Sequence, residues 1–231
     1  MRSAPMKFYV YISDAKVDML LPQVPHDVKK KVAMEFGIDL KVLTAKRITE
    51  VESEENRISR LETVVKFIQE SGNVGTVDKP AQYIEGTLPM RWGPYDTLGN
   101  AKPSFAYFGG ETDKTVLGLG GSLHHVMGNV GTSDPSYPSA SVAPFLLSYL
   151  GNELAAGPSE SKGEETSGAQ AHSDEELAGL DLATRGMKGP LQRLEFLAKR
   201  LFQAPIPRPE RDSHPEMHVL LATPLYVAMA D

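Results

Sequence analysis

The sequence predicts an α+β fold in which a single mixed or antiparallel sheet, built around a central glycine-rich hairpin, is packed by about four helices. Three observations support this fold class. Runs of β-forming residues occupy 8–12 and 218–229, so strands lie near both ends of the chain. Segments with helical periodicity lie between them. Two further apolar runs, 104–108 and 115–122, are joined by a short loop containing glycine, which is typical of a β-hairpin.

The first half of the chain alternates strands and helices. We expect a strand at 8–12, a short helix at 16–21, a helix at 27–36, a strand at 39–51, a helix at 53–69 and a strand at 83–92. Ser13 and Asp14 are suited to cap the first of these helices. The helix at 53–69 has the clearest signal, because Ile58 and Leu61 begin an apolar stripe along one face.

The second half is less regular. We expect a helix at 142–154, an acidic loop at 155–176, a helix beginning at Pro190, an extended proline-rich segment at 203–215 and a strand at 218–229. The leucines that define the Pro190 helix are Leu191, Leu194, Leu197 and Leu201. Pro224 cannot donate a hydrogen bond, so it predicts either an edge position or a β-bulge for the final strand.

These elements predict one interrupted domain. Residues 6–154 form the α+β core, 155–176 are an acidic disordered loop, and 177–231 are a C-terminal helix and strand that complete the same domain. Eight acidic side chains and one lysine lie between Gly151 and Asp181, so this stretch accounts for the whole formal charge of −6. The remainder is close to neutral, which predicts no nucleic-acid-binding surface.

The overall composition is that of a soluble globular protein, with 41% hydrophobic and 23% charged residues. No apolar run approaches the roughly 20 residues that a membrane helix needs, and the first residues lack the apolar core of a signal peptide. We therefore expect a cytoplasmic protein without membrane association. The absence of cysteine excludes disulfides, thiolate metal sites and cysteine nucleophiles.

The leading functional hypothesis comes from the second strand of the hairpin. Gly118 and Gly120 point to the same face and leave it without side chains, so either neighbouring aromatic rings or a ligand must fill it. We expect a small-molecule-binding or sensing domain without catalysis. The residues assigned to its pocket are Arg91, Trp92, Tyr107, Gly118, Gly120 and Ser122. The spacing of the glycines matches neither a phosphate loop nor a dinucleotide fingerprint.

An enzyme is the alternative hypothesis. His124 or His125 would act as a general base with a carboxylate such as Asp14 or Glu85, in a hydrolase or lyase. The structural interpretation, in which one histidine is packed and the other exposed, is favoured, because nothing nearby completes a catalytic set. Asp14 also belongs to an Asp-x-Lys-x-Asp pattern, for which a helix cap is the preferred explanation.

Three residues near the end of the chain are acceptable zinc ligands, and they alternate so that an extended backbone places them on one face. They are His214, Glu216 and His218. Their spacing matches no known ligand pattern, so we expect no metal site, and no motif identifies a cofactor. A third hypothesis is a protein-interaction module that uses the acidic loop and the proline-rich segment, with a protein partner or a homo-oligomer as its target.

Four segments of the chain have distinctive sequences. They are YVYISDAKVDMLLPQVP, GTLPMRWGPY, YFGGETDKTVLGLGGS and VLLATPLYVAMAD. In these segments the chain resembles a family of uncharacterised bacterial proteins found mainly in actinobacteria. The resemblance covers most of the chain except the acidic loop. It implies a bacterial cytosolic origin and attaches no activity, cofactor or catalytic residue.

Overall fold

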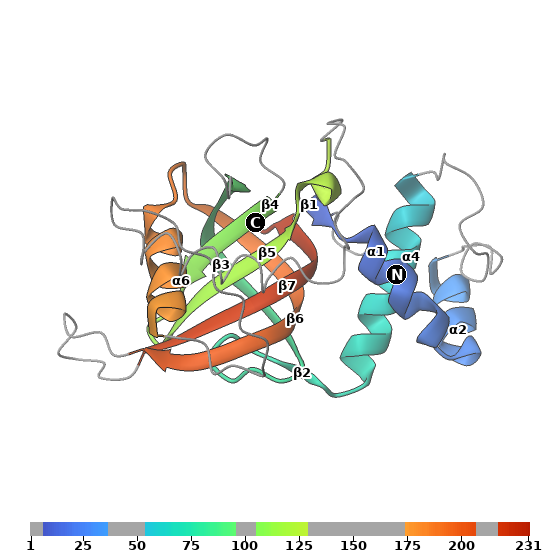
Figure 1. Ribbon diagram of the computed structural model, residues 1–231. Helices are drawn as coiled ribbons and strands as arrows, with labels where there is room; N and C mark the ends of the chain where they lie inside the picture. The colour runs from blue at the N-terminus through green and yellow to red at the C-terminus, as the bar shows by residue number, and fades with distance from the viewer. Residues whose placement is uncertain (1–6, 37–53, 96–104, 129–173, 207–216) are drawn as a thin grey trace, which may run out of the picture.

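The structure is a computed structural model that describes residues 7–36, 54–95, 105–128, 174–206 and 217–231 (Figure 1). The expected strand at 39–51, the expected helix at 142–154 and nearly all of the acidic loop lie outside these ranges. Residues 174–176, which we assigned to that loop, belong to a helix instead. The α+β class is confirmed, and the described residues form a sheet of seven strands.

Five of the strands close into a barrel, which corrects the expectation of a simple open sheet. They are β3 (Tyr83–Tyr95), β4 (Phe105–Glu111), β5 (Thr115–Ser122), β6 (Gln192–Ile206) and β7 (Met217–Met229). Neighbouring pairs are antiparallel except β5 and β7, which are parallel, so the sheet is mixed. Closure arises because the first part of β3 pairs with β6 and its last part pairs with β4.

Two short strands extend the barrel. β1 (Phe8–Ile12) lies antiparallel to the end of β7, and β2 (Val74–Gly75) lies parallel to the start of β3. Pro224 of β7 stands where the register with β6 shifts, so the predicted bulge is confirmed, and β7 is an interior strand with neighbours on both edges.

The helices lie on two sides of the barrel (Figure 1). On one side are α1 (Asp14–Leu20), the 3₁₀ turn η1 (Leu21–Gln23), α2 (His26–Phe36) and α4 (Glu54–Glu70). On the other side is α6 (Asp174–Gly186). A second 3₁₀ turn, η2 (Leu123–His125), follows β5. No helix in the described ranges is long and apolar enough to cross a membrane.

Within the described ranges, the buried apolar residues form three clusters. The first fills the barrel and includes Phe108, Leu119 and Phe196. The second lies between the barrel and the helices α1 and α4. The third lies beneath α6 and includes Tyr107 and Leu180. The barrel is therefore packed from inside and covered by apolar helix faces on two sides.

The helix expected from Pro190 is wrong, because residues 192–206 form strand β6. Its leucines do not share one face. Leu194 lies in the barrel interior and Leu197 lies against the helices on the outer face, while Leu191 and Leu201 are exposed. The pattern that indicates a strand is that every second residue, Leu194, Phe196 and Ala198, points into the barrel. Leu197 obscures this pattern because the other face of the strand is buried here as well.

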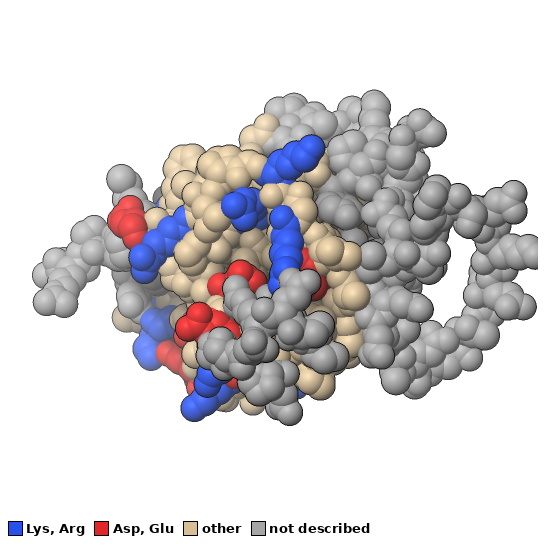
Figure 2. All heavy atoms as spheres, turned by 90° about the vertical axis from the view of Figure 1, so that its left-hand side faces the viewer, with Lys and Arg blue, Asp and Glu red and all other residues tan. Residues whose placement is uncertain are grey.

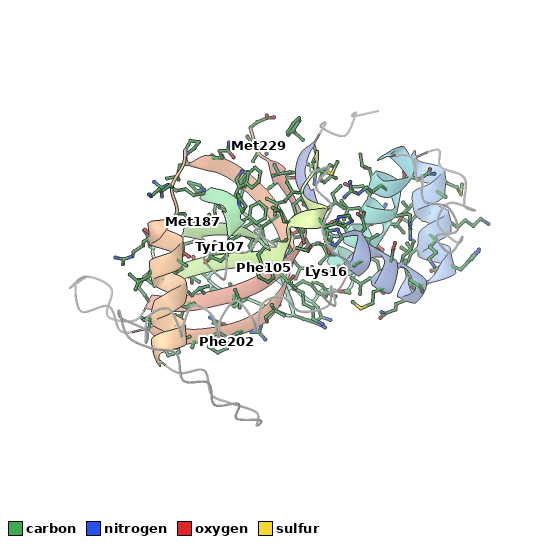
Figure 3. The ribbon with its side chains drawn as sticks, turned by 45° about the horizontal axis from the view of Figure 1, so that its top comes forward. Lys16, Phe105, Tyr107, Met187, Phe202 and Met229 are labelled. Atoms are coloured by element: carbon green, nitrogen blue, oxygen red, sulfur yellow. The ribbon has the colours of Figure 1, made fainter. Side chains whose placement is uncertain are left out.

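The face around Gly118 is filled by a neighbouring aromatic ring. A Cβ atom built on Gly118 would lie 2.5 Å from the Tyr107 hydroxyl and 2.9 Å from a methyl carbon of Leu180. Figure 3 shows Tyr107 beside α6, and its hydroxyl bonds to Oγ1 of Thr184 at 2.7 Å. Of the two alternatives for this face, aromatic packing is the one observed at Gly118.

The side of the molecule on which α6 lies is shown in Figure 2. Basic and acidic side chains are interspersed over its described part. The described residues on this side therefore form no surface of a single charge.

We expect Gly118→Ala to lower the free energy of unfolding by about 1–3 kcal/mol, because the added methyl group overpacks the layer between β5 and α6. Gly93→Ala is the matched control, since nothing lies within 4 Å of a Cβ atom at Gly93. Its effect should stay within about 0.5 kcal/mol. Urea unfolding of the three proteins measures both. Equal losses in the two variants would contradict close packing at Gly118.

Candidate functional site

A group of polar and ionisable side chains is gathered where the barrel meets the helices. We call it the Lys16 cluster; Figure 3 places Lys16 at this junction. Its members are Tyr11, Ser13, Asp14, Lys16, Arg57 and His125. β1 supplies Tyr11, α1 and its N-cap supply the next three, α4 supplies Arg57 and η2 supplies His125. Segments far apart in the sequence therefore build one site.

Backbone pairing holds this junction in place. The Ser13 amide donates to the Leu225 carbonyl at 2.8 Å, which fixes the end of β1 against β7. The Met127 amide donates to the Val10 carbonyl at 2.9 Å, which brings the residues after η2 onto β1. At Ser13 the chain leaves the sheet and α1 begins. Side chains from Tyr11 to Lys16 thus occupy the bend between strand and helix.

Ser13 occupies the N-cap position of α1, as its residue type predicts, but its hydroxyl makes no capping hydrogen bond. Instead Oγ accepts a hydrogen bond from Nζ of Lys16 at 3.1 Å. Ser13 has no exposed surface, and Lys16 is only 8% exposed. Among the described residues, the Ser13 hydroxyl is the one hydrogen-bond partner of the Lys16 amine.

Burial lowers the pKa of Lys16 from 10.5 to about 8, because the charged ammonium loses hydration. At pH 7 roughly one tenth of such an amine is neutral. Near physiological pH, Lys16 therefore exists both as an ammonium, which donates a proton, and as a neutral amine, which accepts one.

Asp14 is oriented by two partners. Its Oδ1 accepts a hydrogen bond from Nε of Arg57 at 2.7 Å, and its Oδ2 lies 3.6 Å from Nδ1 of His125. Arg57 also donates to the carbonyl of Ile12 at 3.3 Å. Burial by itself raises the pKa of Asp14, but the His125 imidazole and the Arg57 guanidinium lower it below its ordinary value. Asp14 is thus held as a carboxylate.

Tyr11 lies at the inner end of the cluster, over Gly121. Its ring makes edge-on contacts with Phe108 and His125, each with centroids 5.9 Å apart. The hydroxyl is fully buried, and no hydrogen bond of good geometry joins it to a described residue. Burial raises the pKa of Tyr11, which the nearby Ser13 side chain offsets only in part. The phenol therefore stays protonated and is available as a donor.

The enzyme hypothesis named four residues, and the fold brings two of them together. Asp14 and His125 are neighbours, whereas the His124 side chain is exposed and its amide donates to Oγ of Ser122 at 3.3 Å. Glu85 accepts from Gln69 at 2.9 Å. Gln69 is twelve residues beyond Arg57 on α4, about 18 Å along the helix axis.

Of the residues assigned to a ligand pocket, Tyr107 lies beside Gly118 and Gly120, whereas Trp92 lies on the opposite face of the sheet. Trp92 stacks on Phe108 with centroids 5.5 Å apart, and Tyr107 lies on the opposite face under α6. Arg91 donates to the Gly189 carbonyl at 3.1 Å. Gly120 pairs with Tyr107 in the sheet, and Ser122 caps η2.

No group of three or more metal-ligating side chains occurs among the described residues. Asp14 and His125 are two neighbouring side chains of metal-ligating type, and a typical zinc site has at least three protein ligands. Of the three zinc-ligand candidates, His214 and Glu216 lie outside the described ranges, and His218 lies in β7 opposite Pro205 of β6.

Sequence reasoning missed Tyr11, the Ser13 hydroxyl, Lys16 as its partner and Arg57. One signal was present: Ser13 and Lys16 are three residues apart at a predicted strand-to-helix junction, and this spacing places both side chains on one helix face. Reading Ser13 as a cap concealed it. No local pattern connects Arg57 with Asp14, because they belong to separate helices.

A family described as a family of unknown function (DUF7019) matches residues 7–231. No curated protein matches the chain. No solved structure matches it either.

Between pH 7 and pH 10, we expect the free energy of unfolding of the wild type to rise relative to that of Lys16→Met. Since the folded-state pKa of Lys16 is lowered to about 8 from 10.5, the unfolded chain binds more protons between these values, and raising the pH there favours the folded state. The gain is on the order of 3 kcal/mol. Urea unfolding of both proteins from pH 7 to pH 10 measures it, and tyrosine ionisation cancels in the difference. A difference that does not change with pH would contradict a buried amine.

Proposed function

The chain belongs to the family of unknown function DUF7019, and we propose that it is a small-molecule-binding domain whose ligand site is the Lys16 cluster. The site differs from the glycine face on which the sequence hypothesis was based. Tyr107 and Leu180 lie within 3 Å of a Cβ atom built on Gly118, which favours the Lys16 cluster over that face.

One observation supports this proposal above the others: a buried lysine faces a hydroxyl instead of a carboxylate. Buried charges are normally paired, and an ammonium group has three donors to satisfy. The arginines nearby obey this rule, since Arg57 pairs with Asp14 and Arg60 pairs with Asp18. Lys16 has the Ser13 hydroxyl alone among the described residues. A ligand with acceptor oxygens would supply the missing partners.

The neighbouring polar atoms favour the same class of ligand. The Tyr11 hydroxyl is also buried without a hydrogen bond of good geometry to a described residue. Buried polar groups in native proteins are nearly all satisfied by protein, water or ligand. Together with the Lys16 amine it forms a pair of donors, which suits a small carboxylate or another acyl compound.

We expect native mass spectra of freshly purified protein to show a mass in excess of the chain, which denaturation removes. The excess should be absent from Lys16→Met, because the cationic anchor is gone. Lys188→Met is the control, since Lys188 is an exposed lysine after α6 and should leave the excess unchanged.

If the purified protein is empty, titration with acetate, butyrate and succinate provides the test. A carboxylate present at 100 times its dissociation constant stabilises the folded protein by about 2.7 kcal/mol. Thermal unfolding should show this for the wild type and for Lys188→Met only. The proposal would be overturned if the protein is purified empty and each of these carboxylates stabilises the wild type no more than it stabilises Lys16→Met.

A further inference from the structure

We propose that Ser13 and Lys16 are a nucleophile and its general base, and that the site hydrolyses a carboxylic ester. This inference rests on the proposed binding function, because the acyl group of the ester would occupy the same cluster. It goes further by assigning a covalent reaction to Ser13.

The position of the Ser13 hydroxyl is the first argument. An N-cap serine normally accepts a hydrogen bond from an amide of the first helical turn. Here the amides of Lys16 and Val17 bond to the Ser13 carbonyl, at 3.1 and 3.0 Å, and the hydroxyl is turned to the Lys16 amine at 3.1 Å. A nucleophile within hydrogen-bond reach of its base is the arrangement that activates serine.

The freedom of the Lys16 amine from carboxylates is the second argument. A lysine acts as a base only in its neutral form, and an adjacent carboxylate would keep it protonated. Two acids lie within two residues of Lys16, yet Asp14 is held by Arg57 and Asp18 by Arg60. Desolvation alone then acts on Lys16 and brings its pKa to about 8, within the range suited to a general base.

The reaction proceeds in two balanced steps. The neutral Lys16 amine takes the proton of the Ser13 hydroxyl while Oγ bonds to the ester carbonyl carbon. The bond from that carbon to the alkoxy oxygen then breaks, and the Lys16 ammonium returns the proton to the departing alcohol. Water attacks the acyl-serine in the same way, which releases a carboxylic acid and restores the hydroxyl. The protonated Tyr11 phenol is a donor beside Ser13 for the oxyanion.

Access to the site requires motion. Ser13 has no exposed surface, so an ester reaches Oγ only when the residues over the cluster separate. Local openings of this kind occur in folded proteins at less free energy than global unfolding. Slow turnover with gated access is therefore the expected behaviour.

The test is covalent labelling with an alkyl fluorophosphonate, followed by intact mass measurement and peptide mapping. The wild type should gain one probe mass per chain on the peptide that contains Ser13. Ser13→Ala should gain none, and Ser71→Ala, which changes an exposed serine, should label like the wild type. Lys16→Met should label at least about 100-fold more slowly. The mapped position on the wild type does not depend on whether any variant folds.

The pH dependence separates a base from a structural partner. The elements that meet at Lys16 carry other ionisable groups, which pair with one another: Asp14 of α1 with Arg57 of α4 and His125 of η2, and Asp18 of α1 with Arg60 of α4. Tyr11 of β1 also belongs to the cluster. The labelling rate of the wild type should rise with pH to a plateau with a midpoint near 8, set by Lys16. In Lys16→Met this step should disappear.

Three outcomes would overturn the inference: no label, a label at another residue, or equal labelling of Lys16→Met. A native spectrum with bound carboxylate but no label on Ser13 would leave the binding function standing and remove the hydrolase. A label on Ser13 in a protein that retains no carboxylate would instead support the hydrolysis and contradict a function limited to binding.

Discussion

The pairing of β7 with three other strands is the constraint on which the rest of the structure depends. β6 runs along one edge of β7 over nearly its whole length, and β5 and then β1 share the other edge. The first two pairings close the barrel, and the third holds the strand that leads into α1. Every residue of β7 from Val219 to Ala228 is buried, so the strand is stabilised by apolar contacts on both faces.

The same constraint explains why the Lys16 cluster is polar. β1 pairs with β7 and then turns away from the barrel into α1. The polar groups at this bend lie beside α4 and η2. Most ionic groups there are satisfied in pairs, as Asp14 is by Arg57. Lys16 departs from this pattern. Desolvating a cation without an opposite charge is costly, and such departures are concentrated where proteins bind or react.

The sequence predicted well those elements whose own residues determine them. β1, β4, β5 and α4 have strong local patterns, and each was expected within a few residues of its observed limits. β6 was mistaken because both of its faces are buried, so its leucines imitated a helical stripe and only the pairing with β3 and β7 made it a strand. At the site, Asp14 and His125 were two of the four residues that the enzyme hypothesis offered as alternatives. Arg57 was not among them, because a contact between separate helices leaves no trace in local spacing.

The antiparallel contact between β1 and β7 joins residues more than two hundred positions apart, with Phe8 opposite Met229. During synthesis on the ribosome, the aromatic strand β1 therefore emerges long before its partner exists. Ser13 cannot take its final place until that partner arrives, because its amide bonds to β7. Contacts of such long range slow folding and leave apolar strand edges open to wrong pairing. On the nascent chain, β1 therefore stays without its partner strand until translation has passed β7.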